Sequence, residues 1–129
     1  MICVSGKSNT KELSVFISDR LTDLHFNGDT QCFPLYYYDQ IDNAEATLFD
    51  AEKTHTVRRD GVTDFILAQA RGLYGDRVTK EDIFYYVYAF LHLPAYRATF
   101  AADLKKSLPR IQLVETPKTF WQLAKAGRA

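Results

Sequence analysis

The run Ser5-Gly6-Lys7-Ser8 comes nearest to a reactive site in this sequence, because it matches the end of the phosphate-binding motif G-x-x-x-x-G-K-S/T. The motif needs its first glycine at the position that Met1 occupies. The residues between are strand formers, which do not make a flexible phosphate cradle, and the chain after Ser8 favours a turn and a strand over the required helix. We therefore interpret this run as a polar turn between two strands.

Cysteines and histidines are too scattered to predict a metal centre or a nucleophile. No C-x-x-C or H-x-x-x-H spacing occurs. His92 stands in an aromatic helical segment, so we expect a core histidine bonded to a neighbour. No serine lies in a G-x-S-x-G elbow, and all four prolines are isolated, which excludes the Asn/Asp-Pro-Pro-aromatic loop of an adenine methyltransferase. We predict no catalytic residue, no metal site and no bound cofactor in this segment.

Small groups of basic side chains are the candidates for contact with nucleic acid. Sixteen basic and sixteen acidic residues cancel, so the overall charge does not support such a role, and affinity would depend on local placement. Lys105, Lys106 and Arg110 are the best candidates, because a helix end and the following turn bring them together where they can contact phosphates. The other groups are Arg58 with Arg59, Arg77 with Lys80, and Lys118 with Lys125 and Arg128. For each group the ordinary alternative is a solvated surface.

Three amides and two tyrosine clusters complete the candidate set. Gln31, Asn27 and Gln112 are candidates for base edges only because amides can pair with adenine through two hydrogen bonds. The tyrosines of 36–38 and 85–88 can stack on bases, or they can fill a core with the hydroxyl at a polar rim. Packing is the favoured interpretation for 85–88, which lie on a helix that is apolar nearly all round. For 36–38 both interpretations stay open.

Residues 79–113 hold the longest unbroken apolar period and predict two helices and a stop. Thr79 caps the first helix with Asp82 three residues on, as in a capping box. Pro94 ends it and begins the second helix, which Pro109 closes, and 110–113 are expected to be extended. A helix capped by Asp60 or Thr63 precedes this unit, and a helix from Thr116-Pro117 to a stop at Gly127 follows it. The residues expected to face inward on the preceding helix are Val62, Phe65, Ile66, Ala70 and Leu73.

The whole pattern predicts an α+β fold in one domain or a piece of one. Residues 1–38 are β-rich, with short antiparallel strands at 2–4, 13–18 and 31–38, and Pro34 places the last strand at an edge or a bulge. Residues 39–57 are expected to be an acidic loop, and 58–129 to form about four helices. The lack of a signal peptide predicts reduced cysteines and a cytoplasmic location, and no apolar run is long enough to cross a bilayer. Both ends suggest a segment excised from a longer protein.

Four blocks in the same order carry a family resemblance. They are GDTQCFPLYYY at 28–38, RRDGVTDF at 58–65, TKEDIFYYVYAFLHLPAYR…FAADLKKSLPRI from 79 to 111, and FWQLAKAGR at 120–128. These blocks resemble the C-terminal region of bacterial type ISP restriction-modification enzymes and related adenine-N6 DNA methyltransferases. The resemblance touches most of the chain apart from 39–57, and none of its blocks is the catalytic motif of the parent family.

The resemblance implies a non-catalytic target-recognition segment that positions double-stranded DNA. Its parent would carry a nuclease, a helicase-type motor and a methyltransferase, with S-adenosylmethionine, ATP and magnesium bound by those other domains. The expected partners are the DNA duplex and the methyltransferase and motor domains of the same chain. The alternative is a helical docking segment that packs on the methyltransferase without contacting DNA, and the neutral net charge modestly favours it.

Overall fold

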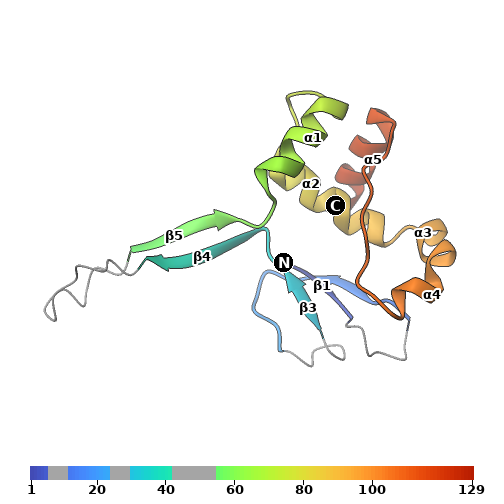
Figure 1. The fold of residues 1–129 in the computed structure, drawn as a ribbon, viewed down its shortest axis with the longest axis horizontal. Coiled ribbons are helices and arrows are strands. Elements are labelled where there is room, and N and C mark those ends of the chain that lie inside the picture. The colour runs from blue at the N-terminus through green and yellow to red at the C-terminus, as the bar shows by residue number, and fades with distance from the viewer. Residues whose placement is uncertain (6–11, 24–29, 42–54) are drawn as a thin grey trace, which may run out of the picture.

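The computed structural model describes residues 1–5, 12–23, 30–41 and 55–129, and it confirms the α+β class. Small antiparallel strands occupy the N-terminal half and helices the C-terminal half (Figure 1). The strands are β1 (Ile2–Val4), β2 (Val15–Ile17), β3 (Gln31–Phe33), β4 (Tyr36–Ile41) and β5 (His55–Asp60). The helices are α1 (Asp64–Tyr74), α2 (Lys80–Leu91), α3 (Pro94–Thr99), α4 (Ala101–Leu104) and α5 (Pro117–Arg128).

The first sheet has the order β2-β1-β3, with both neighbours antiparallel to the central strand. All three residues of β1 are buried, which fits a strand of Ile, Cys and Val covered on both sides. The single strand predicted for 31–38 is wrong, because the chain breaks at Pro34 into β3 and β4. Pro34 has no N–H for a ladder, so β3 ends as a short edge strand, as the position of the proline predicts.

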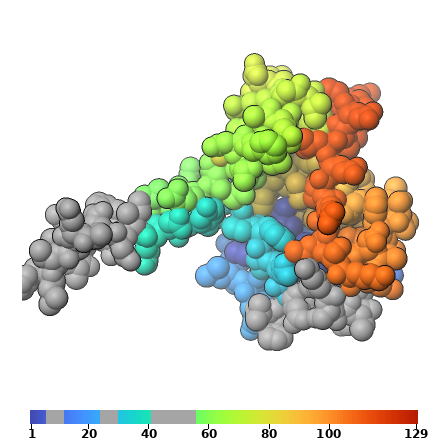
Figure 2. All heavy atoms as spheres, viewed as in Figure 1, coloured from blue at the N-terminus to red at the C-terminus, as the bar shows by residue number. Residues whose placement is uncertain are grey.

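β4 and β5 pair antiparallel from Tyr36 opposite Asp60 to Ile41 opposite His55, and we call this pair the β-ribbon. Figures 1 and 2 show it projecting from the helical body. The loop predicted for 39–57 is therefore a strand at 39–41 and again at 55–57, and 42–54 lie outside the described residues. Acidic Asp39 fits a strand here because the Arg59 side chain, on the same face of the partner strand, lies 2.5 Å from its carboxylate.

α2 is the central helix, and its sides pack into two core clusters, which Val62, Val87 and Ile111 join. Thr79 and Asp82 form the predicted capping box at its start. Ile83 and Tyr86 pack with α1 and α5, while Phe84 and Leu91 pack against the first sheet. This position between two layers allows a helix that is apolar nearly all round to bury its apolar side chains on more than one side.

α5 lies along α2 and does not stop where the sequence pattern predicts. Gly127 is inside the helix, which continues to Arg128. A Cβ atom at Gly127 would collide with the carbonyl oxygen of Tyr85 on α2. The glycine is therefore required by the close approach of two helices, and the interpretation as a C-terminal stop is wrong.

Three further expectations for the helices are corrected. Of the predicted inward face of α1, Ala70 is buried and Val62 and Ile66 pack against the core, whereas Phe65 and Leu73 are 70% and 49% exposed and Tyr74 is buried instead. The helix predicted from Pro94 to Pro109 breaks at Phe100 into α3 and α4, so the described residues form five helices. His92 is exposed at the end of α2, where its ring contacts Tyr88, so it is not a core histidine. No described helix is long and apolar enough to cross a membrane.

Candidate nucleic-acid interface

Residues 105–116 connect α4 to α5, and three tyrosine hydroxyls from three different helices hold this connection. Each hydroxyl donates to a backbone carbonyl, and the acceptors are two residues apart. The bonds join Tyr74 to Val114 at 2.5 Å, Tyr86 to Gln112 at 2.5 Å and Tyr96 to Arg110 at 3.2 Å. Ile111 and Leu113, at the alternate positions, pack against the hydrophobic core. The predicted extended conformation is confirmed, and it leaves Arg110 and Gln112 exposed.

Tyr86 is the most deeply buried of these tyrosines. Its ring lies 5.0 Å from that of Phe120, between centroids, and its side chain has no exposed surface. Burial raises the pKa of its phenol to about 12, so the hydroxyl stays protonated and able to donate at neutral pH. For Tyr86 the packing interpretation of the tyrosine cluster is therefore confirmed.

Three cations at the start of this connection, Lys105, Lys106 and Arg110, form what we call the Arg110 patch. All three are exposed. Within the described parts of the chain, none of them forms an ion pair with a carboxylate. An exposed cation without a carboxylate partner keeps its full charge available to a phosphate.

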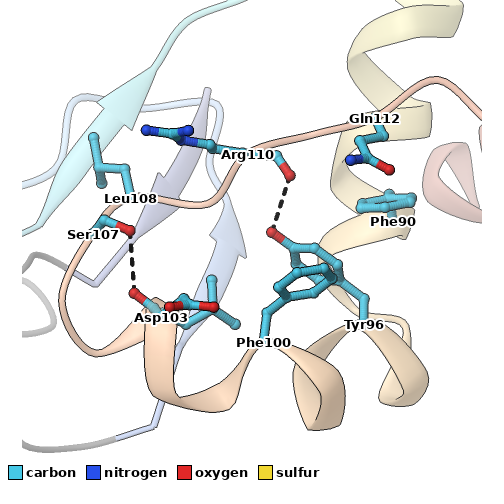
Figure 3. Close-up of a pocket in the computed structure, with 9 residues that line it drawn as sticks. Phe90, Tyr96, Phe100, Asp103, Ser107, Leu108, Arg110 and Gln112 are labelled. Atoms are coloured by element: carbon cyan, nitrogen blue, oxygen red, sulfur yellow. Dashed lines mark hydrogen bonds between the residues drawn. The ribbon is translucent and has the colours of Figure 1, made fainter.

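Beside the Arg110 patch lies a hollow of about 440 Å³, bounded by α3, α4 and the connection. Tyr96 and Phe100 form its aromatic wall, with ring centroids 5.3 Å apart. Figure 3 shows the Arg110 guanidinium on the side of Leu108, turned away from the Tyr96 ring. Lys105 instead lines a separate hollow with Glu12, Leu13, Arg97, Ala98, Ala101 and Leu104. The patch therefore spreads over two neighbouring hollows.

The two arginines of the β-ribbon lie on opposite faces. Arg58 lies over the ring of Tyr36, 4.4 Å from its centroid, and the Tyr36 hydroxyl donates to Glu81 at 3.0 Å. Its face carries exposed Tyr38, which pairs directly with Arg58, and exposed Gln40. Arg59, on the other face, is paired with the carboxylate of Asp39 and so has less charge to offer a phosphate.

Lys80 holds a structural position between three elements. Its ammonium lies 2.8 Å from a carboxylate oxygen of Asp60 on β5 and 2.6 Å from one of Asp64 on α1. The hydrogen bonds to these two carboxylates raise the pKa of Lys80. Two carboxylates already surround this cation, which makes it a weak candidate for a phosphate contact. Arg128 is likewise paired, with its Nη2 2.9 Å from Asp82.

The remaining predicted residues fall at separate places. Gln31 is exposed on the edge strand β3, and Gln112 is exposed on the α4–α5 connection. Asn27 and Gly6-Lys7-Ser8 lie outside the described residues. Among the residues that the structure describes, no three His, Cys, Asp or Glu side chains are grouped as metal ligands. Sequence reasoning placed Tyr86 in the core but missed the backbone acceptors of Tyr74, Tyr86 and Tyr96, which lie 40, 26 and 14 positions away along the chain.

Comparisons with known proteins identify a family and a similar solved structure. Residues 1–129 match the family model described as the type ISP C-terminal specificity domain. Among solved structures, the chain is similar to the cryo-EM structure of a DrdV–DNA complex, with a TM-score of 0.77 and 35% sequence identity. The match covers 98% of this chain and 11% of that chain. A search of curated proteins found no match.

Proposed function

This chain belongs to the family of type ISP C-terminal specificity domains, and we propose that it contacts the DNA duplex through the Arg110 patch and the β-ribbon to position the target site. The similarity to a chain in a DrdV–DNA complex supports this role. The family is one of specificity domains, which agrees with the prediction that this segment does no chemistry by itself.

Among the described residues, Lys105, Lys106 and Arg110 have no carboxylate partner and lie within one short stretch of the chain, and this local concentration of unpaired charge carries the proposal. These cations differ in this respect from Arg59, Lys80 and Arg128. The Tyr96 bond to the Arg110 carbonyl fixes the backbone from which the guanidinium extends. A fixed backbone lowers the entropy lost when a side chain is ordered on a phosphate. The patch would set the orientation of the protein on the duplex without reading sequence.

The β-ribbon supplies a surface that can read bases. A two-stranded ribbon fits the major groove of B-form DNA. On one face of the ribbon, Tyr38, Gln40 and Arg58 are all exposed. An amide can pair with adenine and a guanidinium with guanine through two hydrogen bonds each. Tyr36 under Arg58 holds that guanidinium in one place before DNA arrives.

At the level of the parent protein, we propose adenine-N6 methylation by a methyltransferase domain that binds S-adenosylmethionine. Cleavage would use a nuclease domain and translocation a motor domain, with ATP and magnesium bound by these other domains, in the cytoplasm. This segment would hold the duplex while the methyltransferase flips the adenine out of the stack. The chain spans 11% of the length of the DrdV chain it matches, so these activities would reside in other parts of such a protein.

Duplex binding by the chain, measured by fluorescence anisotropy across a range of salt concentrations, tests the proposal. We expect the logarithm of the association constant to fall linearly with the logarithm of salt concentration, because neutralised phosphates release counterions. The variant Lys105→Glu/Lys106→Glu/Arg110→Glu should lose most of this binding. The association constant that remains should depend less steeply on salt concentration.

The matched control reverses three cations elsewhere on the surface, as Arg20→Glu/Lys118→Glu/Lys125→Glu, which are also exposed. This control changes the net charge by the same amount and should retain most of the affinity. Equal losses in the two variants would show that only total charge matters. No salt-dependent binding by the unaltered chain would contradict the DNA-contact proposal.

One observation favours the docking alternative. On α1, the side chains of Phe65 and Leu73 are 70% and 49% exposed. Large exposed apolar side chains on one element are typical of a surface covered by a partner. If the chain docks through α1, Phe65→Ser should leave the stability of the isolated chain unchanged and expose the helix to proteolysis in the longer protein.

A further inference from the structure

The two cysteines of the chain face each other across the first sheet. Cys3 on the central strand β1 is directly opposite Cys32 on the edge strand β3. The two thiol sulfurs are 3.2 Å apart, and both cysteines are free. The Thr22 hydroxyl lies 3.1 Å from the Cys32 sulfur and 3.7 Å from the Cys3 sulfur. Two thiols and one hydroxyl therefore converge on one point at the sheet.

The backbone already has the geometry that a disulfide requires. Directly opposed residues on antiparallel strands have Cα atoms about 4.5–5.5 Å apart. Disulfides span Cα separations of about 4.4–6.8 Å. The sulfurs need to move closer by about 1.2 Å to reach the bond length of about 2.05 Å, which side-chain rotation can supply without moving the strands.

We propose that Cys3 and Cys32 form a dithiol redox site that a small-molecule disulfide of the glutathione class converts into an intramolecular disulfide. The proposal is independent of the DNA-contact role, because it concerns chemistry within the first sheet. The dithiol is the resting form in a reducing compartment, and the disulfide forms when the small-molecule pool becomes oxidised.

Exposure assigns the order of the two steps. Cys32 is exposed, whereas Cys3 is 1% exposed and burial raises the pKa of its thiol. The Cys32 thiol loses its proton to solvent, and its thiolate attacks one sulfur of the small disulfide, releasing one small thiol. Cys3 then loses its proton and attacks the Cys32 sulfur, which releases the second small thiol. The two protein thiols give up two electrons and two protons, and the small disulfide is reduced to two thiols.

The disulfide would fasten the edge of the sheet to its centre. β3 has three residues, and its described ladder partner is β1 alone. The bond would close a loop between residues 29 positions apart, which restricts the unfolded chain and stabilises the folded one. Because β3 leads through Pro34 into β4, the bond would also fix the base of the β-ribbon.

Equilibration of the chain with reduced and oxidised glutathione tests the site. As the share of oxidised glutathione rises, the free thiols counted with Ellman's reagent after the chain is unfolded in denaturant should fall from two to none. The intact mass should drop by two hydrogens, no disulfide-linked dimer should form, and the midpoint of thermal unfolding should rise. Dithiothreitol should restore the free thiols, the mass and the unfolding midpoint.

Single variants separate the two roles. Cys3→Ser should stop at a mixed disulfide between Cys32 and glutathione. Cys32→Ser, a change at an exposed position, should leave Cys3 largely unreacted in the folded chain. Two thiols that persist in oxidised glutathione would overturn the proposal. So would a product that is a doubly glutathionylated chain or a dimer linked through Cys32.

Discussion

The buried hydroxyl of Tyr86 on α2 donates a hydrogen bond to the backbone carbonyl of Gln112 at 2.5 Å, and the N–H of Val114 donates back to the same hydroxyl at 3.2 Å. One side chain on the central helix thus satisfies two backbone groups of a connection that has no sheet or helix of its own. This is how an extended segment that carries exposed polar side chains is held on the helical core.

Replacement of Tyr86 by phenylalanine should lower the free energy of unfolding by about 1–3 kcal/mol, because it leaves the Gln112 carbonyl and the Val114 N–H without that partner. Urea denaturation followed by circular dichroism measures the change. Tyr85→Phe is the matched control, since the Tyr85 hydroxyl forms no hydrogen bond among the described residues, and it should change stability little. Equal losses in the two variants would contradict the role given to the Tyr86 hydroxyl.

Alkaline pH should lower the free energy of unfolding of the chain, because the Tyr86 phenol loses its proton. The pKa of Tyr86 is about 12 in the folded chain and about 10 in the unfolded chain, so between these values only the unfolded state gives up the proton. The stability that Tyr86 contributes is complete below about pH 10 and is lost as pH rises toward 12. The difference in unfolding free energy between the unaltered chain and Tyr86→Phe should therefore shrink above pH 10. A difference that stays constant from about pH 8 to about pH 11.5 would refute this expectation.

Two helical glycines should respond in opposite directions to alanine. Gly127→Ala places a Cβ against the Tyr85 carbonyl and must push α5 away from α2, so we expect a loss of at least about 1–3 kcal/mol. Gly72 on α1 has open space around it, and Gly72→Ala should stabilise the chain by up to about 1 kcal/mol through helix propensity. Thermal unfolding of both variants measures this contrast, and a stable Gly127→Ala variant would show that the two helices are not so closely packed.

Substitutions at Lys80 and Arg110 should have different effects, one on the stability of the chain and the other on DNA binding. Lys80→Gln removes a cation held between Asp60 and Asp64, so it should lower stability modestly. It should leave the salt dependence of duplex binding unchanged. Arg110→Gln should change the free energy of unfolding by no more than about 0.5 kcal/mol. It should reduce the slope of the logarithm of the association constant against the logarithm of salt concentration by about 0.9 for each phosphate that the variant no longer neutralises. The reverse pattern would place the DNA surface at Lys80 and the start of α2.

Features that depend on neighbouring residues could be predicted from the sequence. The capping box of Thr79 and Asp82, the helix that begins at Pro94 and the extended chain after Pro109 all follow from local backbone chemistry. Pro34 also predicted an edge or a bulge at its position, but not that the chain would divide there into β3 and β4. The family resemblance also lies in ordered local blocks, which is why it could be recognised before any fold was known.

Contacts between residues far apart in the chain could not be read in this way. The carboxylates that neutralise Lys80 come from β5 and α1, and the Tyr86 donor lies 26 positions from its acceptor. The opposition of Cys3 and Cys32 across 29 positions depends on how two strands pair. Sequence alone determined the local structure and identified the candidate cations. Only the packing of helices and strands decided which of those cations keep their charge free, because that depends on which carboxylates the fold brings beside them.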